Sequence, residues 1–305
     1  MIRFAVITDV QYGNLDDLGA RTYRESISKF LRAAGEIATE EVLFTLQLGD
    51  ASQSDWENHL AIKELFDIAE KAGIKWKHVL GNHDFLVDNE KKPDLYADFG
   101  LEKPGYYDFV VNDPEDDSNV WRFVVLNGNE ISTYASETLE EREKAEKERS
   151  RWKLANGNLP ADWNGSVSPR QLQWLESRLK LATKQKEKTL VCSHFPLFAN
   201  SKTLDSDRTR LASLLDVGIY YFNLGVSTWN GKQILDILDK YPCVKGYLAG
   251  HLHEGSYGVR KKVAHITFKG IVETVPNAFA FVKLSSNSII VEGKEAQPSY
   301  EFRFK

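Results

Sequence analysis

The chain has 305 residues, of which 42% are hydrophobic, and a formal net charge of -5 at pH 7. That apolar content is enough for a sizeable core, and because no Pro-, Gly- or Ser-rich linker divides the chain, we expect one domain over residues 1–305. The acidic balance disfavours a general nucleic-acid-binding protein, which would normally present a basic face.

Strands and helical patterns alternate along most of the chain. Two helical patterns, 23–39 and 55–72, carry apolar side chains on one face. The expected strands are mostly continuous apolar runs, as in a buried sheet, at residues 4–8, 42–46, 76–80, 121–126, 189–192 and 244–249. This alternation predicts an α/β fold with a parallel core.

Three later stretches depart from the alternation. Residues 265–304 are β-rich without helices, which suits a second, mainly antiparallel sheet. Residues 137–153 are densely charged with mixed signs at helical spacing, which is typical of a solvated surface helix. Residues 200–230 contain Lys202, Arg208 and several aromatic side chains, and two interpretations stay open. Residues 200–230 form either an insertion that caps a substrate site or an ordinary helix with an aromatic core.

The N-terminus and the cysteines bear on the compartment. Met1-Ile2-Arg3-Phe4 leads directly into a strand without the pattern of a signal peptide, and no stretch approaches the roughly 18 apolar residues of a membrane span. We therefore expect a cytoplasmic protein without a membrane partner. Cys192 and Cys243 are the only cysteines and form no CxxC pair, so we expect buried free thiols.

Five short motifs place metal-binding residues at the ends of apolar runs. They are Asp9-Val10-Gln11, Gly49-Asp50, Gly81-Asn82-His83-Asp84, Ser193-His194 and Gly250-His251-Leu252-His253. Carboxylate, carboxamide and imidazole groups suit manganese, iron or zinc, and the lack of thiolates argues against a structural zinc cage. Strand ends are also where an α/β sheet normally builds its site. The set favours a dinuclear metal site and a metal-dependent phosphoesterase.

Single motifs have simpler explanations. Gly49-Asp50 alone is usually a turn, and a lone buried histidine such as His194 is more often a satisfied core residue. His251 and His253 would point to opposite faces of a regular strand, so both serve one centre only if the backbone leaves strand geometry there. Gly250 would permit that departure.

The ordered set of motifs resembles the calcineurin-like metallophosphoesterase superfamily over residues 4–253. Most members carry histidine where this chain has Gln11. The stretches Asp9-Val10-Gln11-Tyr12 and 265–274, with the pair Trp229-Asn230, are similar to the manganese-dependent ADP-ribose/CDP-alcohol diphosphatase branch. The resemblance implies a four-layer α/β/β/α sandwich and the cleavage of a pyrophosphate linkage in small nucleoside-diphosphate compounds.

The resemblance also implies roles for single residues. Asp50 would bridge two divalent ions, and each ion would have three further protein ligands: Asp9, Gln11 and His253 for one, and Asn82, His194 and His251 for the other. His83 would be the general acid for the departing oxygen or would stabilise developing charge. Asp84 would orient His83 or would only complete the turn.

The residue at position 11 bears on the metal. A carboxamide oxygen is a harder and weaker donor than an imidazole nitrogen, so Gln11 favours manganese or magnesium over zinc. We expect manganese first, with iron, magnesium or zinc as alternatives. Two other functions stay open: a phosphodiesterase acting on cyclic nucleotides or glycerophosphodiesters, and a metal-binding scaffold without turnover. The oligomeric state is not indicated by the sequence.

Overall fold

The computed structural model describes residues 1–153, 159–197 and 226–304. Its helices are α1 (Ser26–Ala38), α2 (Trp56–Lys71), α3 (Lys92–Asp98), α4 (Leu139–Arg151), α5 (Pro169–Gln185) and α7 (Gly231–Leu238), with 3-10 turns η1 (His83–Phe85) and η2 (Asn89–Lys91). Its strands are β1 (Ile2–Ile7), β2 (Thr45–Gln47), β3 (Trp76–His78), β4 (Tyr107–Asp113), β5 (Asp116–Val125), β6 (Ile131–Ser132), β7 (Gly165–Ser166), β8 (Lys188–Cys192), β9 (Val244–Ala249), β10 (Ser256–Arg260), β11 (Val263–Thr267), β12 (Ala278–Leu284), β13 (Ser288–Glu295) and β14 (Tyr300–Arg303).

Most of these strands form two six-stranded sheets within the described residues. The first has the order β14-β13-β12-β1-β2-β3, and its β1, β2 and β3 are parallel. The second has the order β10-β11-β9-β8-β5-β4, and its β5, β8, β9 and β11 are parallel. The parallel core expected from the sequence is therefore divided between two sheets.

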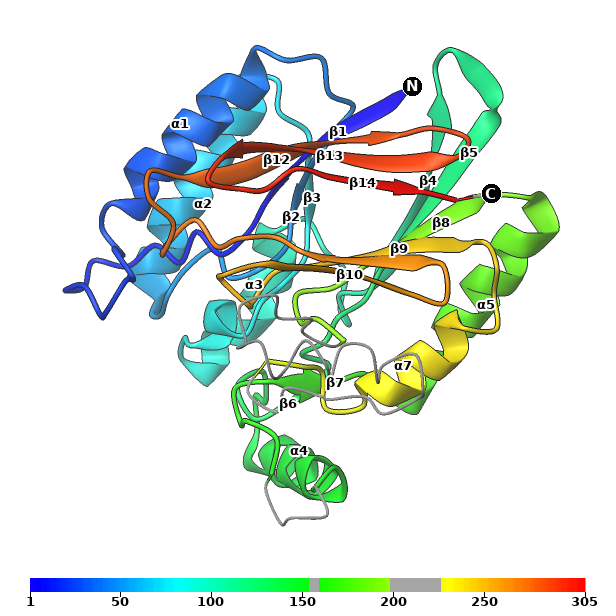
Figure 1. Ribbon diagram of the computed structural model, residues 1–305. Helices are drawn as coiled ribbons and strands as arrows, with labels where there is room; N and C mark the ends of the chain where they lie inside the picture. Colours follow the sequence, from blue (N-terminus) through cyan, green and yellow to red (C-terminus); the bar gives the residue numbers. More distant parts are fainter. Residues whose placement is uncertain (154–158, 198–225, 305) are drawn as a thin grey trace, which may run out of the picture.

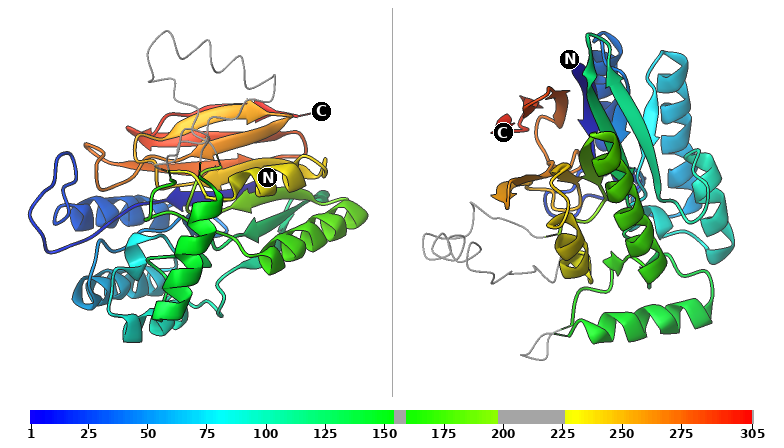
Figure 2. Two further views of the ribbon diagram at one scale, coloured as in Figure 1. Left: turned by 90° about the horizontal axis from the view of Figure 1, so that it is seen from below. Right: turned by 90° about the vertical axis from the view of Figure 1, so that its right-hand side faces the viewer.

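The two sheets pack face to face with helices outside both. Apolar side chains of both sheets, such as Phe4, Phe123 and Leu190, form the core between them. Helices α1 and α2 cover the outer face of the first sheet through Phe30 and Phe66, while α5 and α7 cover the second (Figures 1 and 2). The four-layer α/β/β/α sandwich is confirmed.

The central strands are largely apolar because both faces of each sheet are buried. In β1, Phe4, Ala5 and Val6 have no exposed surface, and the two faces of the strand contact different cores. Two of the helices that cover the sheets begin at side-chain caps: Asp55 accepts from the backbone N–H of Asn58 at α2, and Ser168 accepts from that of Gln171 at α5. The expected helix 55–72 thus corresponds to α2 with small shifts at its ends.

Residues 265–304 were expected to form a second, mainly antiparallel sheet: the antiparallel pairing of β12, β13 and β14 is confirmed, but the expectation of a second sheet is wrong. Strand β12 pairs antiparallel with β1, so β12, β13 and β14 extend the first sheet beyond its parallel part. Strand β11 instead pairs parallel with β9 in the second sheet. Strand composition indicates that a segment enters a sheet, but its partner depends on long-range packing.

The charged stretch 137–153 contains α4, which is a surface helix as expected. Thr138 and Glu141 form a reciprocal capping box, and Ala145 is the one buried residue of the helix. The right-hand view of Figure 2 shows α4 apart from the layers of the sandwich. Cys192 is buried and free, as expected, whereas the free Cys243 is only half-buried.

Two further observations concern the chain as a whole. No described helix combines the length and apolar character needed to cross a membrane. The proposed capping insertion at 200–230 lies mostly outside the described residues, which resume at residue 226.

Candidate metal centre

The five motifs come together at one edge of the sandwich. Three follow β1, β2 and β3 of the first sheet, and two follow β8 and β9 of the second. Backbone hydrogen bonds join their loops: Asp9 N–H donates to Gly49 O at 3.1 Å, and Gly250 N–H donates to His194 O at 3.0 Å. Parallel strands end at the same edge of a sheet, so both sheets contribute side chains to one place.

Several motif residues have unusual backbone angles. Asp9, Gln11, Asp50 and His251 have positive φ values of 50°, 42°, 53° and 66°. This left-handed region is uncommon for residues other than glycine and costs about 1–3 kcal/mol per residue. Such strain gathers at functional sites, where the surrounding structure holds it in place. The expected departure from strand geometry in the last motif therefore occurs, at His251 rather than at Gly250.

The motif glycines allow close approach between loops. Gly49 has a φ of +101°, and a Cβ atom there would lie 2.4 Å from Nδ1 of His194. A Cβ atom at Gly250 would lie 2.0 Å from Oγ1 of Thr8. Larger residues at these positions would therefore displace side chains of the candidate centre.

One group of candidate ligands, which we name the His194 set, consists of Asn82, His194, His251 and the shared Asp50. Nε2 of His194 lies 3.2 Å from Oδ2 of Asp50 and 3.2 Å from Oδ1 of Asn82. Nδ1 of His251 is also 3.2 Å from Nε2 of His194. Asp50, His194 and His251 each offer one atom within 4.8 Å of the others, so they could hold one ion.

The tautomer of His194 is fixed by the backbone. Its Nδ1 lies 2.7 Å from Leu48 O, and a carbonyl oxygen only accepts, so Nδ1 carries the proton. In the neutral ring, Nε2 then presents a lone pair toward the oxygens of Asp50 and Asn82. A divalent cation among these acceptor atoms would satisfy all of them.

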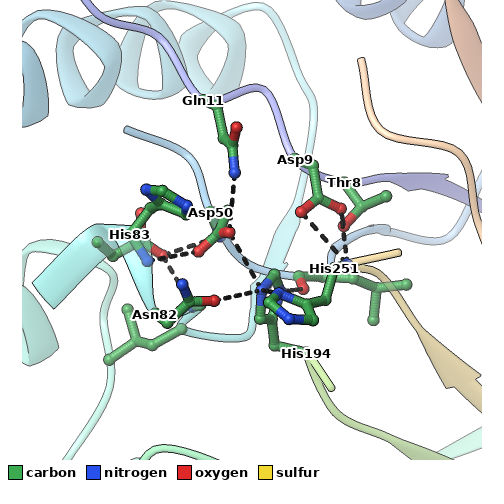
Figure 3. Close-up of polar contacts among 12 residues, drawn as sticks. Thr8, Asp9, Gln11, Asp50, Asn82, His83, His194 and His251 are labelled. Atoms are coloured by element: carbon green, nitrogen blue, oxygen red, sulfur yellow. Dashed lines mark hydrogen bonds and ion pairs between the residues drawn. The ribbon is translucent and has the colours of Figure 1, made fainter. Parts of the chain in front are cut away.

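The other group, the Gln11 set, consists of Asp9, Gln11, His253 and the shared Asp50. Nε2 of Gln11 donates to Oδ2 of Asp50 at 3.1 Å, and Nε2 of His253 lies 3.3 Å from Oδ1 of Asp9. Figure 3 shows Asp50 between Gln11 and the pair Asn82 and His194. Asp50 is therefore placed to join the two sets.

His83 lies beside Asp50 on η1. Its backbone N–H donates to Oδ1 of Asp50 at 2.7 Å, and its Nδ1 lies 3.0 Å from Gln53 O. Because the carbonyl only accepts, Nδ1 of His83 donates, and Nε2 is the atom left to exchange a proton with a bound molecule. Burial lowers the pKa of His83.

Asp84 contacts backbone rather than the ring of His83. Its carboxylate accepts four backbone N–H groups, from Asp50, Ala51, Ser52 and Gly81, at 2.8–3.1 Å. The ring of His83 is oriented by Gln53 O instead. Of the two alternatives for Asp84, these contacts favour the structural one, in which the buried carboxylate joins the loops after β2 and β3.

The carboxylates make this edge of the sandwich attractive to positive charge. Burial disfavours a charged ring, yet Asp50 raises the pKa of His194 to about 9. Burial likewise opposes charge on His253, but Asp9 and Glu273 raise its pKa to about 10. Burial and the neighbouring His194 keep the pKa of His251 well below its usual value.

The donor atoms fit a pair of divalent cations. Oε1 of Gln11 and Nε2 of His251 are buried without a hydrogen-bond partner, although buried polar atoms are normally paired. The donor set combines carboxylates, amides and imidazoles without thiolates, which suits manganese, iron or zinc. The Gln11 set would hold one ion and the His194 set the other, with Asp50 common to both.

Three residues near the candidate ligands escaped the sequence analysis. Oγ1 of Thr8 donates to Oδ2 of Asp9 at 2.6 Å, Gln53 O accepts from His83, and Glu273 contacts His253. The backbone group of Gln53 has no signal in the sequence. Glu273 lies in the stretch 265–274 that carries the narrower resemblance, but its contact with His253 depends on the fold.

The pair Trp229-Asn230 belongs to another part of the structure. Nε1 of Trp229 donates to Ala161 O at 2.9 Å, and Oδ1 of Asn230 accepts from the backbone N–H of Val167 at 3.1 Å. These contacts join the segment before α7 to the chain around β7 and do not reach the candidate ligands. Lys202, Arg208, Arg210, Tyr220, Tyr221 and Phe222 lie outside the described residues.

Comparison with known proteins gives consistent matches. The family model described as calcineurin-like phosphoesterase matches residues 2–255. A manganese-dependent ADP-ribose/CDP-alcohol diphosphatase from Xenopus laevis is 28% identical over 320 residues, covering 91% of this chain and 83% of the relative. The protein of the same name from Arabidopsis thaliana is 28% identical over 327 residues, covering 99% and 97%.

The fold also has a solved counterpart. The crystal structure of a dimetal phosphatase from Danio rerio superimposes with a TM-score of 0.76 at 22% identity, covering 100% of this chain and 99% of that one. At this identity the likeness concerns the fold, and it extends over both sheets and their helices.

Proposed function

Because the chain belongs to the calcineurin-like phosphoesterase family, we propose that it hydrolyses the pyrophosphate bond of nucleoside-diphosphate compounds such as ADP-ribose and CDP-alcohols. The observation that carries the proposal is the convergence of seven candidate ligands on one edge of the sandwich, with Asp50 common to two sets. The reaction adds water across a P–O–P bridge and yields a nucleoside monophosphate and a phosphorylated partner.

The proposed ligands are Asp9, Gln11, Asp50 and His253 for one ion, and Asp50, Asn82, His194 and His251 for the other. When bound, two divalent cations neutralise charge on the phosphoryl oxygens and activate water as the nucleophile. The protein fixes the direction of each donor. The carbonyl of Leu48 orients His194, and the N–H of His83 orients Oδ1 of Asp50.

His83 is the proposed proton donor. With Nδ1 committed to Gln53 O, its Nε2 is the atom that would protonate the bridging oxygen as the P–O bond breaks. The same atom in its charged form would also stabilise negative charge on that oxygen. Asp84 would act indirectly, by keeping the loops of Asp50 and His83 together.

The substrate class rests on similarity along nearly the whole chain. Both relatives named above carry the words manganese-dependent and ADP-ribose/CDP-alcohol diphosphatase in their names. Gln11 supports manganese as the preferred ion, because its oxygen is harder than the imidazole nitrogen it would replace. We propose manganese as the native activator and a small nucleotide compound as the substrate.

The test is hydrolysis by metal-stripped protein reloaded with manganese, magnesium or zinc. Substrates would be ADP-ribose, CDP-choline, a cyclic nucleotide and an activated phosphodiester, with His83→Ala as the variant. Manganese-dependent cleavage of the first two substrates, lost in the variant while bound manganese is retained, is the expected result.

Other outcomes separate the alternatives. Turnover confined to the diesters would keep the metal centre and replace the substrate class. Two bound manganese ions without hydrolysis of any substrate would identify a scaffold.

A further inference from the structure

The loop after β11 lies directly against the Gln11 set. Ile271 N–H donates to Thr8 O at 3.2 Å, and Val272 N–H donates to Asp9 O at 3.0 Å. Gly270 N–H donates to His253 O at 3.1 Å. The loop therefore contacts the backbone beside two candidate ligands that are more than 200 residues apart in the sequence.

Glu273, the next residue of this loop, contacts the ring of His253. Its Oε1 lies 2.9 Å from Nδ1 of His253, whose other nitrogen, Nε2, faces Asp9 at 3.3 Å. Both carboxylates accept, so either ring nitrogen can donate. Once an ion takes the place of the proton on Nε2, Glu273 keeps the remaining proton on Nδ1 and leaves the lone pair on Nε2. The carboxylate thus selects the tautomer that presents a lone pair toward the candidate ion.

Glu273 is itself held in place. Nε of Arg21 donates to its Oε1 at 2.9 Å, from the chain just before α1. The buried Lys29 of α1 places Nζ within 3.3 Å of the carbonyl oxygens of Ile271 and Val272. Both the side chain and the backbone of this loop are therefore restrained, so the carboxylate has a defined direction.

Among the described residues, no carboxylate contacts the far ring nitrogen of His194 in the way that Glu273 contacts that of His253. There the ring of His194 is oriented by a backbone carbonyl, Leu48 O, which carries no full charge. A carboxylate on the far nitrogen of a ligating histidine fixes the ring and raises its basicity more than a neutral acceptor does. Each set contains an amide, Asn82 or Gln11, but the Gln11 set has only one imidazole ring, and it is the one that has this additional anion.

We propose that Glu273 is a positioning residue for the ion of the Gln11 set: it holds His253 in the metal-binding tautomer and compensates for the weak donor Gln11. The stretch 265–274, one of the segments similar to the diphosphatase branch, thereby gains a role through Glu273. This inference rests on the proposed ligand sets. It goes beyond them by assigning a function to a residue that does not itself contact the ion.

The test compares Glu273→Gln and Glu273→Ala with the parent protein by equilibrium dialysis of metal-stripped protein against manganese. We expect the parent to bind two ions per chain, and each variant to retain one ion with parental affinity. The second ion should bind about 10–100-fold more weakly in Glu273→Ala, the usual cost of losing such a partner. Glu273→Gln, which keeps an acceptor oxygen without its charge, should show the smaller loss.

A matched control and a second measurement separate positioning from general damage. The control is Glu295→Gln. The side chain of Glu295 is 23% exposed and accepts from an arginine, and that of Glu273 is 26% exposed and also accepts from an arginine. Glu295→Gln should leave manganese binding unchanged. The ¹⁵N chemical shifts of the His253 ring in protein saturated with magnesium, which is diamagnetic, should report Nδ1 protonation in the parent and a mixture of ring states in Glu273→Ala.

Each remaining outcome contradicts one specific step. Equal affinity for both ions in all Glu273 variants would overturn the positioning role while leaving the proposed function intact. Equal weakening of both ions would also overturn it, because the effect would then not belong to the Gln11 set. Failure of the parent to bind two ions would overturn the ligand sets on which the inference rests.

Discussion

The two halves of the candidate metal centre are built differently. The His194 set brings two imidazole rings, an amide and a carboxylate close together, and three of its atoms lie within 4.8 Å of one another. The Gln11 set has one imidazole, an amide and two carboxylates, with Glu273 behind the imidazole. The first is rich in nitrogen and the second in oxygen and negative charge.

This difference indicates that the two sets prefer different ions. Nitrogen donors suit borderline metals such as zinc or iron, whereas oxygen donors suit manganese and magnesium. The Gln11 set would therefore decide the requirement for manganese, and the His194 set would accept several metals. Asp50 alone among the proposed ligands belongs to both.

The largest expected effect comes from removing what the two sets share. Asp50→Asn keeps the shape of the side chain but removes its charge. Loss of a residue that only hydrogen-bonds a ligand weakens metal binding by up to about 100-fold, so loss of this ligand's charge should weaken the binding of both ions by more than that. Manganese-dependent turnover should be lost with it. Equilibrium dialysis measures the binding, and Asp67→Asn, at an exposed carboxylate that pairs with Lys63 at 2.7 Å, is the control. Loss of one ion only would show that the sets are independent.

The next effect concerns a residue outside both sets. His83→Ala should lower kcat by about 10²–10⁴-fold, the usual contribution of a general acid, because Nε2 would no longer donate. Manganese binding should stay at two ions, since the ring is not a proposed ligand. Steady-state kinetics on ADP-ribose together with dialysis checks both statements. A variant that loses an ion would place His83 among the ligands instead.

A third change disturbs the His194 set alone. Gly49→Ala introduces a Cβ atom 2.4 Å from Nδ1 of His194, whereas Gly73→Ala, at the nearly equal φ of +103°, meets nothing within 4 Å. Both variants carry the same backbone strain, so the steric overlap with His194 should cost Gly49→Ala about 1–3 kcal/mol more of the free energy of unfolding. Denaturant unfolding of the metal-free proteins measures the difference. Equal losses would mean that the loop relaxes without moving His194.

A smaller effect tests the metal preference of the Gln11 set. Gln11→His should raise the ratio of zinc- or iron-supported activity to manganese-supported activity by on the order of tenfold, about 1.4 kcal/mol. Gln11→Glu keeps an oxygen donor and should keep the preference for manganese. Activity of the reloaded proteins with each metal gives the ratios. An unchanged profile in Gln11→His would remove the link between this residue and manganese.

The smallest effect provides a reference from a histidine that belongs to neither set. Burial lowers the pKa of His78 to about 3, so between pH 6.5 and 3 the unfolded chain binds more protons than the folded one. The free energy of unfolding therefore falls as the pH falls through this window, by about 1 kcal/mol between pH 6 and 5 from this residue. Unfolding of the parent and of His78→Phe at both pH values measures it. The same loss in both proteins would contradict the assignment.

Much of the site was predictable because its signals are local. Asp9, Asp50 and His194 each follow an apolar run, and parallel strands bring such positions to one edge of a sheet. The charged pattern of 137–153 likewise predicted α4, whose capping box is visible in the sequence. A short stretch of sequence is enough for features of this kind.

The contacts between distant segments were not predictable in the same way. The pattern of 265–304 shows strands but not that β12 pairs with β1. Of the two alternatives for Asp84, the one in which it orients His83 overlooked Gln53 O, a backbone group that any residue could supply. Glu273 looks like an ordinary loop carboxylate until the fold places it against His253.

The sequence by itself determined the candidate ligands, the alternation of strands and helices, and the resemblance to a phosphoesterase family. The tertiary structure alone decided the division of the strands between two sheets, the left-handed backbone at Asp9, Gln11, Asp50 and His251, and the partner of each imidazole ring. The physical reason is the distance along the chain over which each interaction acts. Propensity, capping and apolar periodicity act over a few residues. Strand pairing and the orientation of imidazole rings depend instead on packing between segments that lie far apart in the sequence.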